Sequence, residues 1–238
     1  MTVQYVGGKS KIARRLAAVM LAETPDRWSY FEPFVGGGAV LGEMAPHFDM
    51  VAASDIHADL ICMFRAVQGG WVPPSEVSEA EYGALKANKA PSPLRGFVGF
   101  ACSFGGKWFG GYARSSKVAC VAEWGSSSLR KMAPKIAGVR FSQGDYADLS
   151  IPLDAVVYCD PPYAGTQGYA TGDFDHEAFW QWATKLSSRC TVFVSEYAAP
   201  PGWVSLWERE QPGYLAGAKL GYKKATEHLF VYRPRQGE

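Results

Sequence analysis

The spacing of apolar and polar positions along the chain predicts short strands that alternate with helices. Ile12, Leu16, Val19 and Met20 recur at helical spacing, so they predict one apolar helix face. Short apolar runs bounded by glycine, proline or aspartate are typical of buried strands. The pattern predicts helices over Lys9–Glu23, Ala39–Ala45, Ala58–Val67 and Asp175–Leu186, and strands over Ser29–Glu32, Met50–Ser54, Val139–Ser142, Ala155–Cys159, Thr191–Ser195, Val204–Trp207 and Leu229–Tyr232.

The order of these elements predicts an α/β fold with one insertion. A strand, the glycine turn 36–38, a helix, a second strand and Asp55 follow one another, which is a nucleotide-binding βαβ pattern. Between Pro73 and Pro93, proline pairs mark an exit from the sheet, and the chain then looks mainly helical up to Ala137, apart from one glycine-rich loop. We therefore predict a core formed by residues 1–70 and 138–238 and an insertion over residues 71–137.

The composition is that of a folded protein. Of 238 residues, 47% are hydrophobic and 20% are charged, which excludes a disordered chain. The uncharged stretches are much shorter than the roughly 20 apolar residues that cross a bilayer. The five cysteines are far apart, odd in number and without a C-x-x-C pair, so they exclude a zinc knuckle and a disulfide scaffold. We expect a cytoplasmic protein with no membrane partner and no metal site.

The formal net charge of +1 hides a strong asymmetry. Between Lys86 and Arg140 there are ten basic residues and a single acid, Glu123. The segment from Phe141 to Thr184 then carries seven acids and no lysine or arginine. Because clustered cations attract phosphates through the local field rather than through net charge, the insertion is a candidate nucleic-acid surface. A solvated basic surface without a partner is the alternative.

A glycine-rich loop within the insertion combines aromatic and basic residues. Four glycines lie between Gly105 and Arg114, together with large aromatics and two cations. Aromatic faces beside cations suit stacking on exposed bases or wedging into a duplex. The alternative is a buried plug, in which the aromatic side chains of the loop pack into the protein interior. The candidate DNA-contacting residues are Lys107, Trp108, Tyr112, Arg114 and Lys117.

The strongest chemical signal follows the strand that ends at Cys159. There the chain reads Asp160-Pro161-Pro162-Tyr163, at the strand edge where α/β proteins bind ligands. The Asp160 carboxylate and the Pro161 carbonyl can accept both hydrogens of an exocyclic amine, which directs the nitrogen lone pair toward an electrophile. The prolines fix these acceptors, and Tyr163 offers a face for a base. A strand that merely ends in a proline turn is the alternative.

Other motifs indicate an adenosine-type cofactor, and they exclude a P-loop and a catalytic cysteine. The run Gly7-Gly8-Lys9-Ser10 is not a P-loop, because Val3 stands where that loop needs its first glycine. The turn 36–38, followed by Asp55 after the next strand, suits a ribose whose hydroxyls the acid accepts. Cys159 lies before the prolines in a buried strand, so it is a core residue rather than a nucleophile.

Several moderate motifs stand in the order of a known family. With the D-P-P-Y motif they make the chain similar to the Dam-like adenine-specific DNA methyltransferases, in which the cofactor motif precedes the catalytic motif. The resemblance covers most of the chain. The further motifs that carry it are Tyr5-Val6-Gly7-Gly8-Lys9, Phe31-Glu32-Pro33-Phe34-Val35-Gly36-Gly37-Gly38, Ser54-Asp55-Ile56, Gly144-Asp145-Tyr146 and Ala225-Thr226-Glu227-His228-Leu229.

The resemblance implies a fold, a reaction and a set of site residues. It implies a Rossmann-like S-adenosylmethionine-dependent methyltransferase sheet with a small helical DNA-recognition insertion. It also implies methyl transfer from S-adenosylmethionine to the amine of an adenine flipped out of double-stranded DNA, without a metal. The catalytic residues would be Asp160, Pro161, Pro162 and Tyr163, and the cofactor-binding residues Tyr5, Lys9, Phe34, Gly36, Gly38, Asp55, Asp145 and Asp160.

The chain departs from the family at two places. The loop Lys107–Tyr112 replaces the family's Tyr-Asn-Gly recognition core, and Ser195-Glu196-Tyr197 replaces its Ser-Asn pair. Base-reading residues are therefore not transferred, and the target sequence and a restriction–modification role stay open. Cytosine amino-group methylation is the alternative within the same chemistry. From other classes, a nicotinamide-dependent oxidoreductase and a non-catalytic DNA-binding module remain. We expect a bacterial or phage-encoded monomer or weak dimer.

Overall fold

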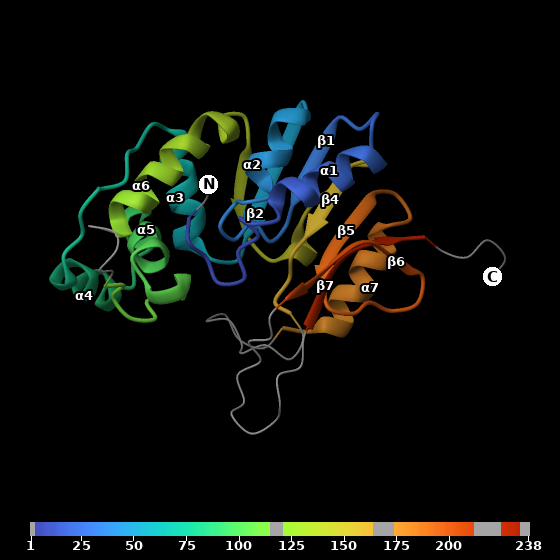
Figure 1. The fold of residues 1–238 in the computed structure, drawn as a ribbon. Helices are drawn as coiled ribbons and strands as arrows, with labels where there is room; N and C mark the ends of the chain where they lie inside the picture. The colour runs from blue at the N-terminus through green and yellow to red at the C-terminus, as the bar shows by residue number, and fades with distance from the viewer. Residues whose placement is uncertain (1–2, 115–120, 164–173, 212–224, 234–238) are drawn as a thin grey trace, which may run out of the picture.

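Seven strands form one sheet in the order β3-β2-β1-β4-β5-β7-β6 (Figure 1). The computed structural model describes residues 3–114, 121–163, 174–211 and 225–233. The first five strands in chain order are parallel neighbours, and β7 runs antiparallel between β5 and β6. The strands are β1 (Ser29–Glu32), β2 (Met50–Asp55), β3 (Arg140–Gln143), β4 (Val156–Cys159), β5 (Thr191–Glu196), β6 (Trp203–Gln211) and β7 (Ala225–Tyr232).

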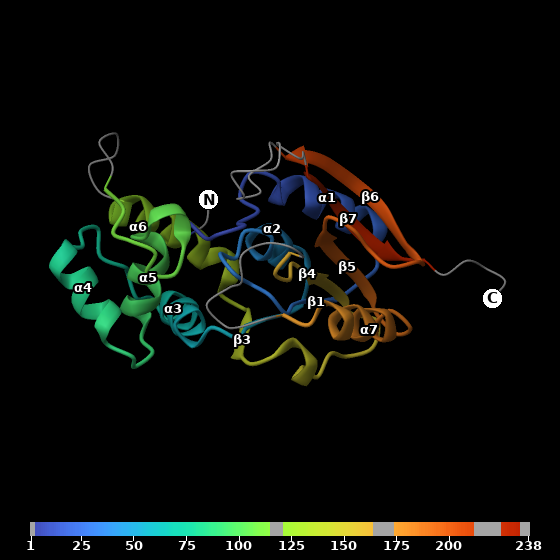
Figure 2. The same ribbon diagram turned by 90° about the horizontal axis from the view of Figure 1, so that it is seen from below.

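Helices cover both faces of the sheet. Figure 2 shows α1 (Ala13–Glu23) and α2 (Leu41–Met44) on one face and α7 (His176–Leu186) on the other. Because successive strand residues point to opposite faces, β4 contributes to two separate cores. Its residues Val156 and Tyr158 join the core under α1 and α2, whereas Val157 and Cys159 join the core under α7. Helices on both faces explain why all four residues of β4 are buried and apolar or aromatic.

The insertion packs against one end of the sheet. Figure 1 shows α4 (Glu79–Ala87), α5 (Pro93–Ala101) and α6 (Val121–Met132) gathered beside α3 (Ala58–Gln68). Phe97 and Phe100 lie three residues apart on α5, and both are buried in the same core as α1 and α3. Four 3-10 turns complete the described elements: η1 (Ala45–His47), η2 (Phe104–Gly106), η3 (Ala133–Ile136) and η4 (Tyr146–Asp148). The division into two domains at residues 70 and 138 stays a prediction.

The predicted α/β class is confirmed, but some element limits differ. Helix α1 begins at Ala13 rather than Lys9, because residues 9–12 form a turn in which the Ile12 N–H donates to the Lys9 carbonyl. Strands β6 and β7 are longer than their apolar runs, since their polar ends pair with each other across the hairpin. In the described part of the chain, no helix is long and apolar enough to span a membrane.

Candidate active site

The site lies where the strand order reverses, between β1 and β4. In an open parallel sheet, ligands bind at the carboxyl ends of the strands at such a switch point. The chain leaving β1 forms the glycine turn, and the chain leaving β4 begins with Asp160. A cavity of about 670 Å³ opens there, and both segments line it. That volume lies within the range of roughly 300–1,000 Å³ typical of small-molecule sites.

Asp55 fastens the glycine turn to the end of β2. Its two carboxylate oxygens accept hydrogen bonds from the backbone N–H groups of Gly36 and His57, each at 3.0 Å. Gly36 has a φ of +45°, and a Cβ there would lie 3.0 Å from the Tyr5 ring. Glycine is thus required both by the backbone and by the ring that covers the turn. Burial raises the pKa of Asp55 to about 6, although the backbone hydrogen bonds oppose the shift.

Lys9 joins the N-terminal loop to two carboxylates. Its Nζ atom lies 2.8 Å from Asp160 Oδ1 and 3.3 Å from an oxygen of Glu227, and it donates to the Gly7 carbonyl at 3.0 Å. Burial alone would lower the pKa of Lys9, but the two carboxylates raise it, and the net shift is upward. Lys9 therefore stays charged at neutral pH and anchors Asp160 at the end of β4.

Asp160 stands among groups that disfavour its ionised form. Burial raises the pKa of its carboxyl group, and nearby Lys9 opposes that shift. Burial also raises the pKa of Glu32, whose carboxyl accepts a hydrogen bond from Tyr30 at 2.7 Å. The neighbouring Tyr158 hydroxyl shares a hydrogen bond of 2.9 Å with Ser195. The aspartate lines the cavity, with 20% of its side chain exposed.

Tyr163 is held on several sides. Its hydroxyl donates to Glu227 at 2.8 Å, and Lys9 Nζ lies 4.7 Å from its ring centre. The Tyr197 ring packs almost perpendicular to it, at 4.7 Å between centres. Pro161 is buried, and Pro162 lines the cavity. The four residues of the D-P-P-Y motif are therefore together at the site.

The remaining predicted cofactor residues also gather at this edge. Tyr5, Phe34 and Asp145 line the cavity together with Lys9, Gly36, Asp55 and Asp160. The Phe34 ring packs against Tyr146 at 5.3 Å between centres. Gly38 belongs to the same turn, with a φ of +70°, but it faces Phe64 and Met132 rather than the cavity.

The glycine-rich loop of the insertion points its largest side chains inward. Trp108 fills the space above Gly99, where an added Cβ would lie 2.2 Å from the indole, and it also lines the cavity. Phe109 is buried, and the Tyr112 hydroxyl donates to the Val77 carbonyl at 2.7 Å. These contacts favour the buried plug for Trp108 and Tyr112 over a surface for stacking on DNA. Lys107 is exposed at the cavity rim.

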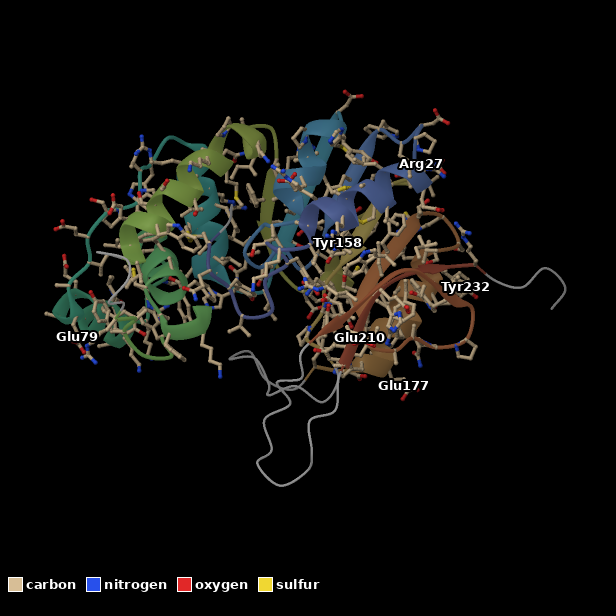
Figure 3. The ribbon with its side chains drawn as sticks, in the orientation of Figure 1. Arg27, Glu79, Tyr158, Glu177, Glu210 and Tyr232 are labelled. Atoms are coloured by element: carbon tan, nitrogen blue, oxygen red, sulfur yellow. The ribbon has the colours of Figure 1, made fainter. Side chains whose placement is uncertain are left out.

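Two further basic residues lie in ion pairs. Arg114 pairs with Glu79 at 2.5 Å on the surface, and Figure 3 shows Glu79 at the outer end of the insertion, whereas Tyr158 lies near the centre of the molecule. Arg95, one of the ten cations counted in the basic segment, is buried in an ion pair with Asp59 and adds nothing to the surface. Lys117 lies outside the described residues.

Sequence reasoning missed two residues at this edge. Glu32 and Glu227 were quoted within motifs but given no role, although both are buried beside Asp160. A glutamate in an otherwise buried strand is the signal that could have singled them out. In the adjoining turn η2, Phe104 comes directly before Gly105, Gly106 and Lys107, and 74% of it is exposed.

Comparison with solved structures gives only weak likenesses. The 23S rRNA methyltransferase ErmE is 10% identical, with a TM-score of 0.45, covering 97% of this chain and 70% of that one. The N-methyltransferase NodS from Bradyrhizobium japonicum WM9 is 7% identical, with a TM-score of 0.45, covering 94% and 95%. At TM-scores below 0.5, these likenesses assign no function to the chain.

Comparison with known sequences is more informative. No curated protein sequence matches the chain significantly. Residues 5–89, about a third of the chain, match the family model of the D12 class N6 adenine-specific DNA methyltransferases. The matched segment contains Tyr5, Lys9, the glycine turn and Asp55, and the D-P-P-Y motif lies outside it. Over this segment the chain is similar to the D12 class N6 adenine-specific DNA methyltransferases, and the match supports S-adenosylmethionine as its cofactor.

Proposed function

We propose that Asp160 and Pro161 carry methyl transfer to the exocyclic amine of an adenine flipped out of double-stranded DNA. One observation carries the proposal. Asp160 lies in the same cavity as the glycine turn and Asp55, on the strand next to β1. A cofactor on the turn and an amine on Asp160 would therefore meet inside one cavity. Flipping is needed because the amine of a stacked base cannot reach a buried carboxylate.

The residues at the glycine turn fit S-adenosylmethionine. Both Asp55 oxygens already accept a backbone hydrogen bond, but a carboxylate has about four lone-pair sites, so it can also accept from both ribose hydroxyls. Ile56, 49% exposed, also lines the cavity and offers an apolar surface to an adenine ring. When bound, this cofactor supplies an electrophilic methyl group on a sulfonium.

The protein's part in the reaction is to aim the amine and to accept its hydrogens. Asp160 keeps Lys9 on one oxygen and has lone pairs for one amine hydrogen, and the Pro161 carbonyl accepts the other. With both hydrogens held, the nitrogen lone pair would be drawn out of conjugation with the ring and directed at the methyl group that the bound cofactor supplies. The Asp160 carboxylate, already on one amine hydrogen, would accept the proton that the methylated amine loses. Positioning and electrostatics supply the rate.

The rim of the cavity beside the insertion suits the DNA. Lys107 is exposed there, and Phe104 projects from the adjoining turn. That turn is well ordered by hydrogen bonds, because the Phe104 N–H donates to Gly111 at 2.8 Å and the Val6 N–H donates to Gly106 at 3.3 Å. An exposed aromatic beside a cation can stack on a base while the cation contacts phosphate. We assign the stacking role to Phe104 in place of Trp108 and Tyr112.

A product analysis tests the proposal. The enzyme is incubated with labelled S-adenosylmethionine and unmethylated double-stranded DNA, and the digested nucleosides are separated. Label on the adenine amine supports the proposal, whereas label on cytosine selects the alternative base. Absence of label from a folded enzyme that binds both partners would refute methyl transfer to DNA. Cytoplasmic location, bacterial or phage origin and a monomeric or weakly dimeric state stay predictions.

A further inference from the structure

Glu227 reaches the catalytic edge although it belongs to the last strand. Because β7 is antiparallel, it enters the sheet at the edge where the parallel strands end. The register pairs its neighbour His228 with Glu196, the last residue of β5. The Glu227 residue is only 1% exposed. A carboxylate so deeply buried needs partners that stabilise its charge.

Two groups of the site converge on a single oxygen of Glu227. The Tyr163 hydroxyl donates to Oε1 at 2.8 Å, and Lys9 Nζ lies 3.3 Å from the same atom. Lys9 also contacts Asp160 Oδ1 at 2.8 Å. Glu227 is therefore linked directly to the aromatic end of the D-P-P-Y motif and, through Lys9, to its acidic end.

We propose that Glu227 is a positioning residue for methyl transfer, which holds Tyr163 in place and keeps Lys9 between two carboxylates. The inference rests on the proposed function, because it assigns Glu227 to that same reaction. Without Glu227, the Tyr163 hydroxyl loses the carboxylate that it contacts at 2.8 Å, and Lys9 keeps Asp160 as its carboxylate partner. Both changes move the groups that hold the base and its amine.

The charge of Glu227 has a second effect on the reaction. Asp160, Glu227 and Lys9 together carry one net negative charge when all three are ionised. The methyl group transfers with positive charge, and that charge reaches the amine, so a net negative cluster stabilises the transition state. A neutral residue at position 227 would remove this net charge.

The same charge also acts on the titration of Asp160. Glu227 repels the ionised form of Asp160, and this repulsion adds to burial in raising the Asp160 pKa. The other groups facing Asp160 are Lys9 from the N-terminal loop, Glu32 from β1, Tyr158 and Tyr163 before and after it in the chain, and Tyr197 after β5. Removing the Glu227 charge while keeping its shape should therefore lower the pKa of Asp160.

The first test needs neither DNA nor cofactor. The protein is labelled with carbon-13 at aspartate carboxyl groups, and the Asp160 signal is assigned from its loss in Asp160→Asn. We expect the Asp160 pKa to be lower in Glu227→Gln than in the wild type. The matched control is Glu208→Gln on the exposed face of β6, which should leave this pKa unchanged. An unchanged Asp160 pKa in Glu227→Gln would overturn the charge coupling.

The second test measures turnover and binding separately. We expect Glu227→Gln to lower kcat about 10- to 100-fold, as for loss of an interaction with a charged group, while DNA and S-adenosylmethionine dissociation constants change by less than about threefold. Tyr163→Phe removes the other partner, so the double variant should lose less than the product of the two single losses. A wild-type kcat in Glu227→Gln, or strictly multiplicative losses, would refute the positioning role.

The two proposals fail in different ways. A wild-type protein that transfers no methyl group to DNA contradicts the proposed function, while the aspartate titration still reports on Glu227. A wild-type protein that methylates adenine, with an unaffected Glu227→Gln variant, contradicts only the inference about Glu227.

Discussion

The ionisation of the Asp55 carboxyl group should make the affinity for the cofactor depend on pH. Its pKa is raised to about 6 by burial, so its ionised form is lost as the pH falls through 6. The ionised form is the one that accepts from both ribose hydroxyls. We therefore predict that the affinity for S-adenosylmethionine is constant above about pH 7 and falls below pH 6, by up to about tenfold per pH unit.

Calorimetric titration of the enzyme with S-adenosylmethionine at several pH values checks this prediction. Asp55→Asn is the matched control, because it cannot ionise and should bind weakly at every pH. A wild-type affinity that stays constant down to about pH 4.5, near the ordinary aspartate range, would contradict the assigned role.

Residues at the cavity differ in how far the sequence reveals them. Asp160 directly follows β4 and Asp55 is the last residue of β2, so the pattern of strands places both at one sheet edge. Glu227 could not be placed in this way, because its position depends on β7 running antiparallel. Lys9 was expected within a helix, and only the fold shows that its side chain turns back to Asp160.

At the scale of elements, one buried ion pair fixes the insertion to the core. Arg95 of α5 pairs with Asp59 of α3, and Asp59 also accepts a hydrogen bond from the Ser92 N–H at 2.9 Å. We predict that Arg95→Met lowers the free energy of unfolding by about 3–5 kcal/mol, because it leaves a buried carboxylate without its counter-charge. Urea unfolding followed by circular dichroism measures the change.

Arg114→Met is the matched control for this measurement. Its partner Glu79 is exposed, so the loss should change stability little. Equal destabilisation by the two variants would show that burial of the Arg95 pair is not what holds α5 against α3.

The turn at η2 carries a second prediction at this scale. Phe104→Ala should weaken DNA binding by about 1–3 kcal/mol, the usual contribution of one aromatic stacked on a base. Trp124→Ala on α6 is the control, since Trp124 is also exposed, at 58%, but lies on a different element from the η2 turn and Lys107. Fluorescence anisotropy with labelled DNA measures both. Equal losses, or none for Phe104→Ala, would remove Phe104 from the DNA surface.

The spacing of apolar residues predicted the buried face of a helix better than it predicted how a loop packs against other elements. Ile12, Leu16 and Met20 were placed on one apolar helix face by their spacing, and all three are buried. The glycines around Trp108 suggested an exposed loop, but Gly99 leaves room for the indole to fold inward. The packing of Trp108 on Gly99 depends on a residue in another element, so the local sequence around Trp108 does not predict it.

At the scale of the whole molecule, the net charge of +1 is the sum of a basic segment and an acidic segment. Several cations of the basic segment are already paired, notably Arg95 with Asp59 and Arg114 with Glu79. Lys107 lies at the cavity rim beside the site. Counting cations along the sequence therefore overestimates the charge available to DNA.

This distribution predicts different salt effects for two basic residues. Lys107→Ala should weaken DNA binding and reduce the slope of log K against log salt by about 1, because one phosphate contact is lost. Arg114→Ala should change the slope less, because Glu79 already balances that charge. Anisotropy titrations over a range of salt concentrations decide this, and an unchanged slope for Lys107→Ala would exclude its contact with phosphate.

The most direct measurement of the central claim is the single-turnover rate of methyl transfer by wild-type enzyme and Asp160→Ala, with the labelled nucleoside identified and DNA affinity measured alongside. The account predicts N6-labelled adenine from the wild type, a loss in rate of at least about 10²–10³-fold in the variant, and little change in DNA affinity. An Asp160→Ala variant that transfers at the wild-type rate, or a wild type that labels cytosine instead of adenine, would contradict it.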